Sequence, residues 1–206
     1  MGATRPLVLD DIEDLRSYER GREEYRRRII ELKRRRRIPV GPFVTLVFEN
    51  RETVRFQVQE MARAEKMVSD AQVQGELDVY NALLPAPGEL SATMFIELTD
   101  EAALREWLPR LVGIERSVEL RIGPDPLGPP APSSVAPAVP EAAHDAALTR
   151  TGTTASVHYL RFPLTPDQVE GLRTQPAALA VTHPRYAHAT MLSDETRREL
   201  ALDVAP

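Results

Sequence analysis

The segment RETVRFQVQEMARAEKMVSDAQVQGELDVYNALLP, residues 51–85, decides the helical part of the predicted fold. Apolar side chains from Val54 to Val68 recur at spacings of four and three residues, in a stretch without glycine or proline. This spacing places them on one face of an α-helix, whereas a strand would require strict alternation. Asn50 is a residue type favoured as an N-cap, so we expect a helix over about 51–68.

A second helix should follow directly and complete a helical hairpin. Ser69 with Gln72 three residues later is a capping box, and Pro85 sets the latest end of this helix. Two acidic residues share the apolar faces of the pair, Glu65 on the first helix and Glu76 on the second. A carboxylate that is turned inward needs an ion-pair, hydrogen-bond or metal partner, because burying an unpaired charge is unfavourable.

An amphipathic helix with a narrow apolar face should precede the hairpin. Asp10 with Glu13 is a capping box that starts this helix, and Pro39 follows its end. Gly21 is a candidate break within it. The N-terminal part is therefore predicted to be one helix or a helix pair.

Alternating apolar and polar residues predict strands around these helices. The strands are expected at residues 40–50, 90–98, 116–122, 155–164 and 177–183. Further helices should occupy residues 100–113, capped by Thr99 or Asp100, residues 165–175, capped by Thr165 with Pro166 following, and residues 193–204. Strand, short helix and strand near the C-terminus form the outline of a β-α-β unit, which favours parallel pairing. We therefore expect an α+β fold with a mixed β-sheet, an N-terminal helix or helix pair, a central helical hairpin and a C-terminal β-α-β unit.

A proline-rich stretch divides the chain. Residues 123–152 hold seven prolines and almost no large apolar side chains, which is typical of an extended connector. We expect an N-terminal α+β body over 1–122, a partly disordered connector over 123–153, and a C-terminal segment over 154–206 that completes the same domain.

The composition indicates a globular protein and excludes several types of functional site. At 206 residues, with 42% hydrophobic and 28% charged residues, the chain has the balance of a globular protein. It contains no cysteine, which excludes disulfides, thiolate-bound iron–sulfur clusters and a cysteine nucleophile. Phosphate-loop, dinucleotide-binding and serine-hydrolase motifs are absent. The sequence shows neither a membrane-spanning apolar run nor the pattern of a signal peptide, so we expect a cytoplasmic protein.

Carboxylates and a histidine form a candidate metal site. His158 shares the more apolar face of its strand, and with Glu65 and Glu76 it makes a ligand set suited to iron, manganese or zinc. Glu49 and Glu97 end strands and would supply hydrogen bonds around these ligands. The alternative is metal-free: the acids pair with some of the 24 arginines, and His158 is a satisfied core residue.

The front of the chain is basic although the whole chain is acidic. Residues 1–37 hold 12 basic and 8 acidic side chains, whereas the formal charge of the chain is −5. A basic run at the end of a helix complements the helix dipole and also suits an acidic protein partner. Nucleic acid is the weaker candidate, because no aromatic-rich strand accompanies the run. The predicted docking surface consists of Lys33, Arg34, Arg35, Arg36 and Arg37.

A set of short stretches carries a family resemblance. The stretches are GPFVTLVFENRETVRFQVQEMARAEK, ELDVYNALLP with LSATMFIEL, LVGIE, SVHYLRFPLT and HPRY. Together they span most of the chain outside the connector and resemble an uncharacterised bacterial family, that of domain of unknown function 3501. The resemblance implies a redox or oxidative-stress setting, with a rubrerythrin-like protein or an iron–sulfur oxidoreductase as partner. It implies no particular reaction.

The resemblance also implies which polar positions recur in the family. Besides Glu65, Glu76 and His158, they are Glu49, Gln57, Gln59, Glu60, Tyr80, Asn81, Glu97, His183 and Tyr186. We expect these residues to bind a ligand or to support the site. The chain departs from the family pattern at Thr182, where an aspartate is expected, and before residue 156, where a lysine is usual. Both departures weaken the case for a charged C-terminal site.

Two functions remain open at this point. In the first, the chain is an accessory protein of a redox system with a carboxylate–histidine metal site. In the second, it is a metal-free protein-binding or scaffold module whose acids are paired with arginine. The sequence leaves open whether the protein is an enzyme.

Overall fold

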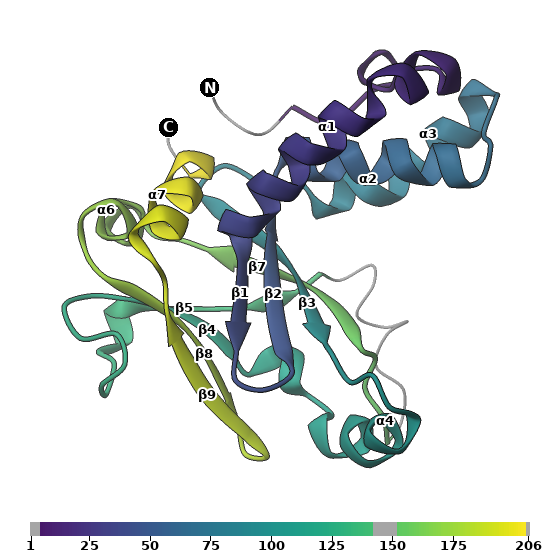
Figure 1. Ribbon diagram of the computed structural model, residues 1–206. Helices are drawn as coiled ribbons and strands as arrows, with labels where there is room; N and C mark the ends of the chain where they lie inside the picture. The colour runs from purple at the N-terminus through teal and green to yellow at the C-terminus, as the bar shows by residue number, and fades with distance from the viewer. Residues whose placement is uncertain (1–4, 142–151, 205–206) are drawn as a thin grey trace.

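Two antiparallel sheets and a group of helices build the fold (Figure 1). The computed structural model describes residues 5–141 and 152–204. Sheet A has the strand order β1–β2–β3–β7–β6, and sheet B has the order β5–β4–β8–β9. Sheet A consists of β1 (Arg37–Val40), β2 (Val44–Glu49), β3 (Glu89–Ile96), β7 (Val157–Pro163) and β6 (Val139–Pro140). Sheet B consists of β5 (Val135–Pro137), β4 (Val118–Ile122), β8 (Ala177–His183) and β9 (Tyr186–Met191).

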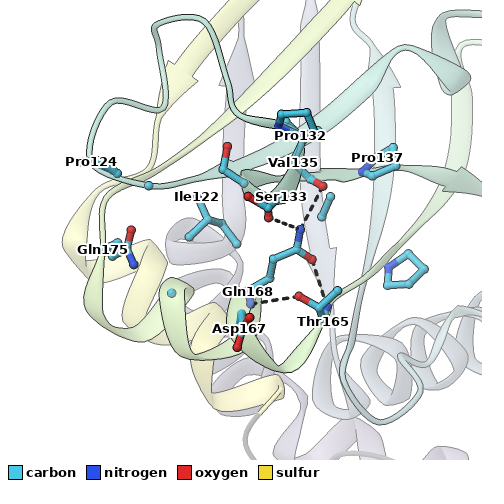
Figure 2. Close-up of a pocket in the computed structure, with 15 residues that line it drawn as sticks. Ile122, Pro124, Pro132, Ser133, Val135, Pro137, Thr165, Asp167, Gln168 and Gln175 are labelled. Atoms are coloured by element: carbon cyan, nitrogen blue, oxygen red, sulfur yellow. Dashed lines mark hydrogen bonds between the residues drawn. The ribbon is translucent and has the colours of Figure 1, made fainter.

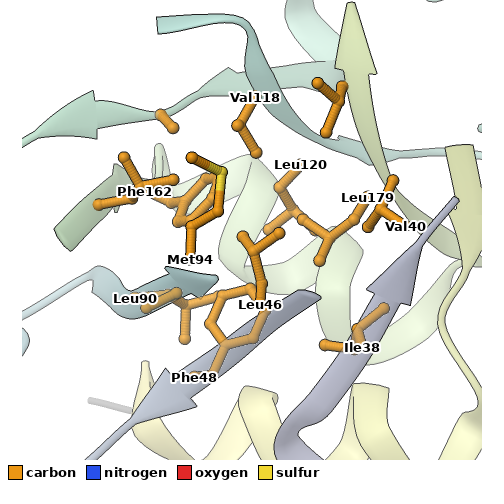
Figure 3. Packing of buried hydrophobic residues seen from close by; sticks show 14 of the residues in the cluster. Ile38, Val40, Leu46, Phe48, Leu90, Met94, Val118, Leu120, Phe162 and Leu179 are labelled. Carbon is orange, nitrogen blue, oxygen red and sulfur yellow. The ribbon is translucent and has the colours of Figure 1, made fainter. Parts of the chain in front are cut away.

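The inner faces of the two sheets enclose the main core (Figure 3). Leu46 and Met94 are paired across β2 and β3 of sheet A, and Leu120 and Leu179 are paired across β4 and β8 of sheet B. All four side chains are fully buried. The alternation in the sequence separates the face of Leu46 and of Met94 from the opposite face of the same strand, because successive side chains of a strand point to opposite faces.

The predicted α+β class is confirmed, but the sheets are not mixed. Every strand pair in the described residues is antiparallel. The two strands of the predicted β-α-β unit lie in different sheets, since β7 pairs with β3 while β8 pairs with β4 and β9. Helix α6 (Pro166–Thr174), capped by Thr165 as predicted, carries the chain between the sheets. A strand–helix–strand order cannot distinguish a crossover within one sheet from a crossover between two.

Part of the proline-rich segment belongs to both sheets. β5 and β6 are edge strands, of sheet B and sheet A respectively. Pro137 and Pro140 fit there because proline, which lacks an amide hydrogen, is tolerated in edge strands. Where the chain crosses between the sheets, the amide of Ala138 donates to Val118 O at 2.8 Å. Residues 135–140 are thus built into the two sheets, and residues 142–151 of the predicted connector lie outside the described residues.

Three helices lie beside the outer face of sheet A at one end (Figure 1). They are α1 (Leu15–Arg36), α2 (Arg51–Ala64) and α3 (Asp70–Tyr80). Asp14, not Asp10, caps α1, and the helix continues unbroken through Gly21. Between β3 and β4, α4 (Glu101–Trp107) is shorter than predicted, because Pro109 cannot extend its hydrogen-bond ladder. In the described ranges, no helix is long and apolar enough to cross a membrane.

Two edge strands, β1 and β9, have no counterpart among the predicted strands. The sequence places β1 at the end of a helix, where Pro39 reads as a stop signal. The stretch that contains β9 reads as a surface turn, because Pro184 follows the histidine that ends β8. β1 has four residues and β9 has six, and a proline lies in or beside each, so the alternation of apolar and polar residues alone does not predict either strand.

The helical hairpin is confirmed, but its turn comes earlier than predicted. Lys66 adopts a left-handed conformation with φ of 53° and ends α2. The Lys66 amide donates to Arg63 O at 3.2 Å and the Met67 amide to Ala62 O at 2.9 Å, an arrangement in which glycine is usual. Val68 is consequently 88% exposed and does not lie on the apolar face.

Arg36 is fully buried where α1 meets β2 and the C-terminal helix α7 (Asp194–Asp203). Its Nε donates to Phe48 O at 2.9 Å, its Nη1 donates to Glu199 at 3.0 Å, and its Nη2 pairs with Asp203. Burial raises the pKa of the Asp203 carboxyl above its usual value, and the Arg36 guanidinium partly offsets that rise. The predicted role of Arg36 in docking a partner is corrected by its burial, since it cannot reach a partner.

Glu60 holds α1 against α2. Its Oε1 accepts hydrogen bonds from the Tyr18 hydroxyl at 2.6 Å and from Arg22 Nε at 2.7 Å, and its Oε2 accepts from Arg22 Nη2 at 2.8 Å. The Arg22 guanidinium lowers the pKa of the Glu60 carboxyl below its usual value, although burial opposes this effect. Glu60, which the resemblance assigned to the site, therefore clamps two helices together.

Replacing Arg36→Ala should lower the free energy of unfolding by about 3–5 kcal/mol, because the largely buried Asp203 would lose its arginine partner, while Glu199 would keep only Arg35. Urea unfolding measures this change. Arg34→Ala is the matched control, since Arg34 belongs to the same basic run but pairs with Glu31 on the surface. Equal stability of the two variants would contradict the structural role assigned to Arg36.

Replacing Glu60→Gln should destabilise the protein by about 1 kcal/mol at pH 7, because the side chain is partly solvent-screened. The pKa of Glu60 is lowered in the folded state, so its contribution is complete above the unfolded pKa of about 4.3 and is lost as pH falls through the folded pKa. The difference from wild type should therefore shrink below about pH 4. Urea unfolding from pH 7 to pH 3, with the exposed Glu31→Gln as control, tests this; a constant difference would rule out the ion pair as its cause.

Candidate functional site

The three predicted metal ligands do not form one cluster. Glu65 is the exposed C-cap of α2 and lies near Glu76, whose pKa is raised by burial and, to a smaller extent, by Glu65. His158 faces the core from β7, and its Nε2 lies 2.8 Å from Thr154 Oγ1 and 3.0 Å from Ala155 O. Within residues 5–141 and 152–204, no group of three His, Cys, Asp or Glu side chains is placed to hold a metal ion.

Two of the predicted amide side chains fasten the N-terminal segment. Asn81 exchanges hydrogen bonds of 2.8 and 3.0 Å with the amide and carbonyl of Leu7. Gln59 does the same with Glu13, at 2.9 and 2.8 Å. Each amide side chain thus accepts a hydrogen bond from the main-chain amide of one residue and donates one to the carbonyl of the same residue. Tyr80 packs against the apolar cluster beneath this segment.

Tyr186 and His183 hold the main chain at one edge of the two sheets. The Tyr186 hydroxyl donates to Val40 O at 2.7 Å and accepts from two amides at the start of β2, at 3.2 and 3.1 Å. His183 Nδ1 accepts from the Arg185 amide at 3.2 Å, and its Nε2 lies 3.3 Å from Val112 O. Both residues are buried. Their observed contacts are structural.

Glu49, Gln57 and part of the basic run meet at one cleft between α1 and the outer face of sheet A. We call it the α1–sheet cleft. Its volume of about 660 Å³ is sufficient for a small organic molecule. The residues that line it are Arg26, Ile29, Ile30, Lys33, Arg34, Arg37, Val47, Glu49, Phe56, Gln57, Leu83, Thr93, Phe95, Val157 and Tyr159.

The floor of the cleft is formed by outward-facing residues of sheet A. Val47, Thr93 and Tyr159 are neighbours across β2, β3 and β7. Glu49, the next outward residue of β2, is only 5% exposed. Its Oε1 accepts from Thr93 Oγ1 at 3.0 Å, whereas its Oε2 has no hydrogen-bond partner among the described residues. Such an oxygen is unfavourable when buried, so it marks a place where a ligand could donate a hydrogen bond.

The same floor changes the acidity of Tyr159. Burial raises the pKa of its hydroxyl above the usual value, and the nearby Tyr80 and Glu49 raise it further. Tyr159 is therefore neutral near pH 7 and keeps its hydroxyl hydrogen. The floor thus combines one carboxylate, one threonine hydroxyl and one neutral phenol within a mostly apolar wall.

Cationic side chains from α1 line the cleft above this floor. Arg26 and Lys33 make no ion pair with any other residue in the part of the chain that the structure describes. Among the described residues, Arg34 pairs with Glu31 alone, at 2.8 Å, on the exposed surface. These three cations therefore remain accessible to an anionic group.

The predicted docking surface is divided between two tasks. Arg35 pairs with Glu199 at 3.2 Å, and Arg36 is buried. Arg37 pairs with Glu97 and also lines the cleft. Of the run, Lys33 has no ion-pair partner among the described residues, and Arg34 pairs there only with Glu31 of the same helix, so the run does not form one continuous docking surface.

A second cavity, of about 640 Å³, opens between β5 and the first turn of α6 (Figure 2). Its central polar side chain is Gln168, whose Nε2 donates to Ser133 O at 3.2 Å and to Val135 O at 3.0 Å. The Oε1 of Gln168 accepts from the Thr165 amide at 3.0 Å. Because the hydrogen bonds of Gln168 are satisfied within the protein, this cavity offers a ligand less than the α1–sheet cleft does.

Several lining residues of the cleft are not among the predicted site residues. Thr93 and Tyr159 alternate with core residues on strands that the sequence predicts, so the period of two could have placed them opposite the core. The period of two does not show what covers the outward face of sheet A. Only the packing of α1, with Ile29 and Arg26, turns the outward row of the sheet into the floor of a cleft.

Comparisons with known proteins agree with this fold. The chain is similar to a crystal structure of a protein of unknown function from Burkholderia pseudomallei, with 32% sequence identity and a TM-score of 0.85. The alignment covers 98% of this chain and 100% of that one. No curated protein matches the chain. Residues 6–204 match the family described as protein of unknown function (DUF3501), and the chain therefore belongs to that family.

Proposed function

We propose that the protein is a metal-free binding module whose α1–sheet cleft takes a small, largely apolar molecule. The observation that carries the proposal is the buried Glu49 carboxylate, which presents an unpartnered Oε2 at the floor of this cleft. Small-molecule sites in proteins usually combine apolar walls with a few placed polar groups. The α1–sheet cleft has this composition.

The pairing of other acids supports a metal-free function. Both carboxylate oxygens of Glu60 accept hydrogen bonds from Arg22. Glu89 pairs with Arg161, and Asp203 pairs with Arg36. Arginine pairs bidentately with carboxylates, so these acids have their charge compensated inside the chain.

The remaining accessible cations support a ligand in place of a protein partner. Lys33 and Arg34 lie on the wall of the cleft, beside Ile29 and Ile30. An acidic partner protein would need a broad cationic surface, whereas two or three cations beside a cavity suit one anionic group. We therefore assign these side chains to the cleft.

Filling the cleft should abolish binding of a neutral apolar probe. Val157→Trp places an indole against the floor, and titration with N-phenyl-1-naphthylamine should show at least about tenfold weaker binding than wild type, because the apolar volume is occupied. Val79→Trp is the matched control, since Val79 is exposed on α3 and does not line the cleft. An equal Kd of the probe for wild type and for Val157→Trp would contradict the proposed function.

A second candidate function is the metal-dependent accessory role in a redox system. The observation that favours it is the proximity of Glu65 and Glu76: burial raises the pKa of the Glu76 carboxyl, and the neighbouring Glu65 raises it further. Two neighbouring carboxylates can share a cation, although His158 lies elsewhere, in the core. A rubrerythrin-like protein or an iron–sulfur oxidoreductase would be the partner in this case, on the basis of the family resemblance.

Metal analysis separates the two functions. Protein purified without oxygen or chelator should contain less than about a tenth of an equivalent of any transition metal if the function is metal-free. The content should not change in Glu65→Ala, in Glu76→Ala, or in the control Glu101→Ala on α4. About one equivalent in wild type that is lost in the first two variants alone would favour the metal-dependent role.

A further inference from the structure

We infer that the ligand of the α1–sheet cleft is an amphipathic anion with an anionic group at one end, an apolar body, and a hydroxyl or amine donor at the other end. This inference rests on the proposed function and adds the chemistry and the orientation of the ligand. It follows from three features of the cleft: the polar groups of the floor, the cations of α1, and the apolar residues that line both.

The floor requires a hydrogen-bond donor. Glu49 is 5% exposed, and Thr93 engages only one of its two oxygens. The other oxygen has no partner among the described residues and belongs to a side chain that lines the cleft. A hydroxyl or an amine can donate to this oxygen, whereas an ester or a ketone cannot. Hydrogen bonds to an ionised carboxylate are stronger than those between neutral groups, so the donor should contribute selectivity.

The wall of α1 requires an anion. Four lining residues are cationic, and Glu49 is the single acidic one in the described lining. Arg37 already pairs with Glu97, but Arg26 and Lys33 have no ion-pair partner in the described ranges, and Arg34 has only an exposed one. The excess of positive charge favours a carboxylate, phosphate or sulfate group on the ligand.

The apolar part of the lining requires an apolar body. Ile29 of α1, Phe56 of α2, and Phe95 and Val157 of the floor line the same cleft as the cations and Glu49. Ile30, on the same wall, is 51% exposed, so an alkyl or aryl group would remove apolar surface from water there. A ligand with both polar ends but no apolar body would leave these apolar side chains in contact with water.

Four decanoic-acid derivatives test each end separately. They are methyl decanoate, decanoate, methyl 10-hydroxydecanoate and 10-hydroxydecanoate, which differ only in the anion and the donor. Each is titrated against the full chain with bound N-phenyl-1-naphthylamine, at fixed ionic strength, and displacement gives its Kd. We expect the carboxylate and the hydroxyl each to tighten binding about tenfold, the size expected for a hydrogen bond or ion pair to a charged group.

Variants assign each gain to one end of the cleft. The double variant Lys33→Glu with Arg34→Glu should remove the gain from the carboxylate and keep the gain from the hydroxyl. Glu49→Gln should do the opposite, reducing the gain from the hydroxyl to less than about threefold, because a neutral amide is a weaker acceptor. Arg20→Glu is the control for charge reversal, since Arg20 is exposed on α1 and does not line the cleft.

The outcomes distinguish this inference from the proposed function. Binding of all four compounds with equal Kd, or gains that survive both sets of variants, would overturn the amphipathic anion and leave an apolar binding module. Failure of all four compounds to displace the probe would remove the proposed function itself. If Glu49→Gln does not fold, the wild-type series and the surface variant of Lys33 and Arg34 still decide the result.

Discussion

The buried guanidinium of Arg36 joins three parts of the chain that are far apart in sequence. It ends α1, binds the carbonyl of Phe48 at the end of β2, and pairs with Asp203 and Glu199 on α7. A buried cation is tolerated only when its donors are occupied by acceptors. The contacts of Arg36 therefore fix the orientation of the C-terminal end of α1 relative to sheet A. The position of α1 over sheet A, and with it the α1–sheet cleft, depends on this interaction.

A second attachment fixes the other part of α1. Glu60 of α2 binds Tyr18 and Arg22, near the start of the helix. Between the two attachments, α1 spans the outer face of the sheet with Ile29 and Ile30 on the wall of the cleft. The hydrogen-bonded backbone of an α-helix is rigid over this length. α1 can therefore be held at both of its ends and still leave a cavity between its middle part and the sheet. The cleft is thus a consequence of where α1 is anchored.

Glu49 connects the scaffold with the candidate site. Its carbonyl accepts from Arg36 Nη2 at 3.3 Å, while its carboxylate faces the cleft and binds Thr93. The main chain at this residue is held by the buried cation, so the carboxylate is presented from a rigid position. Glu60, Glu89 and Asp203 are paired with arginines, whereas the Glu49 Oε2, which has no hydrogen-bond partner among the described residues, belongs to a side chain that lines the cleft.

The sequence by itself determined the elements whose causes are local. The α+β class, the helical hairpin, and the caps Asn50, Ser69 and Thr165 follow from periodicity and from hydrogen bonds between residues that are three apart. The family followed from the same stretches. Candidate residues were recovered only in part: Glu49 and Gln57 line the cleft, whereas Glu65, Glu76 and His158 do not meet.

Only the tertiary structure decided which strands share a sheet, which arginines are buried, and which face of sheet A is covered. Each of these depends on partners that are remote in sequence, as Arg36 depends on Asp203 and β3 depends on β7. The left-handed Lys66 is a further case, because lysine does not favour this conformation, and the burial of the next residue, Met67, depends on packing that the local sequence does not show. Periodicity reports which side of an element is apolar, and the packing of distant elements determines whether the other side meets water, a helix or a ligand.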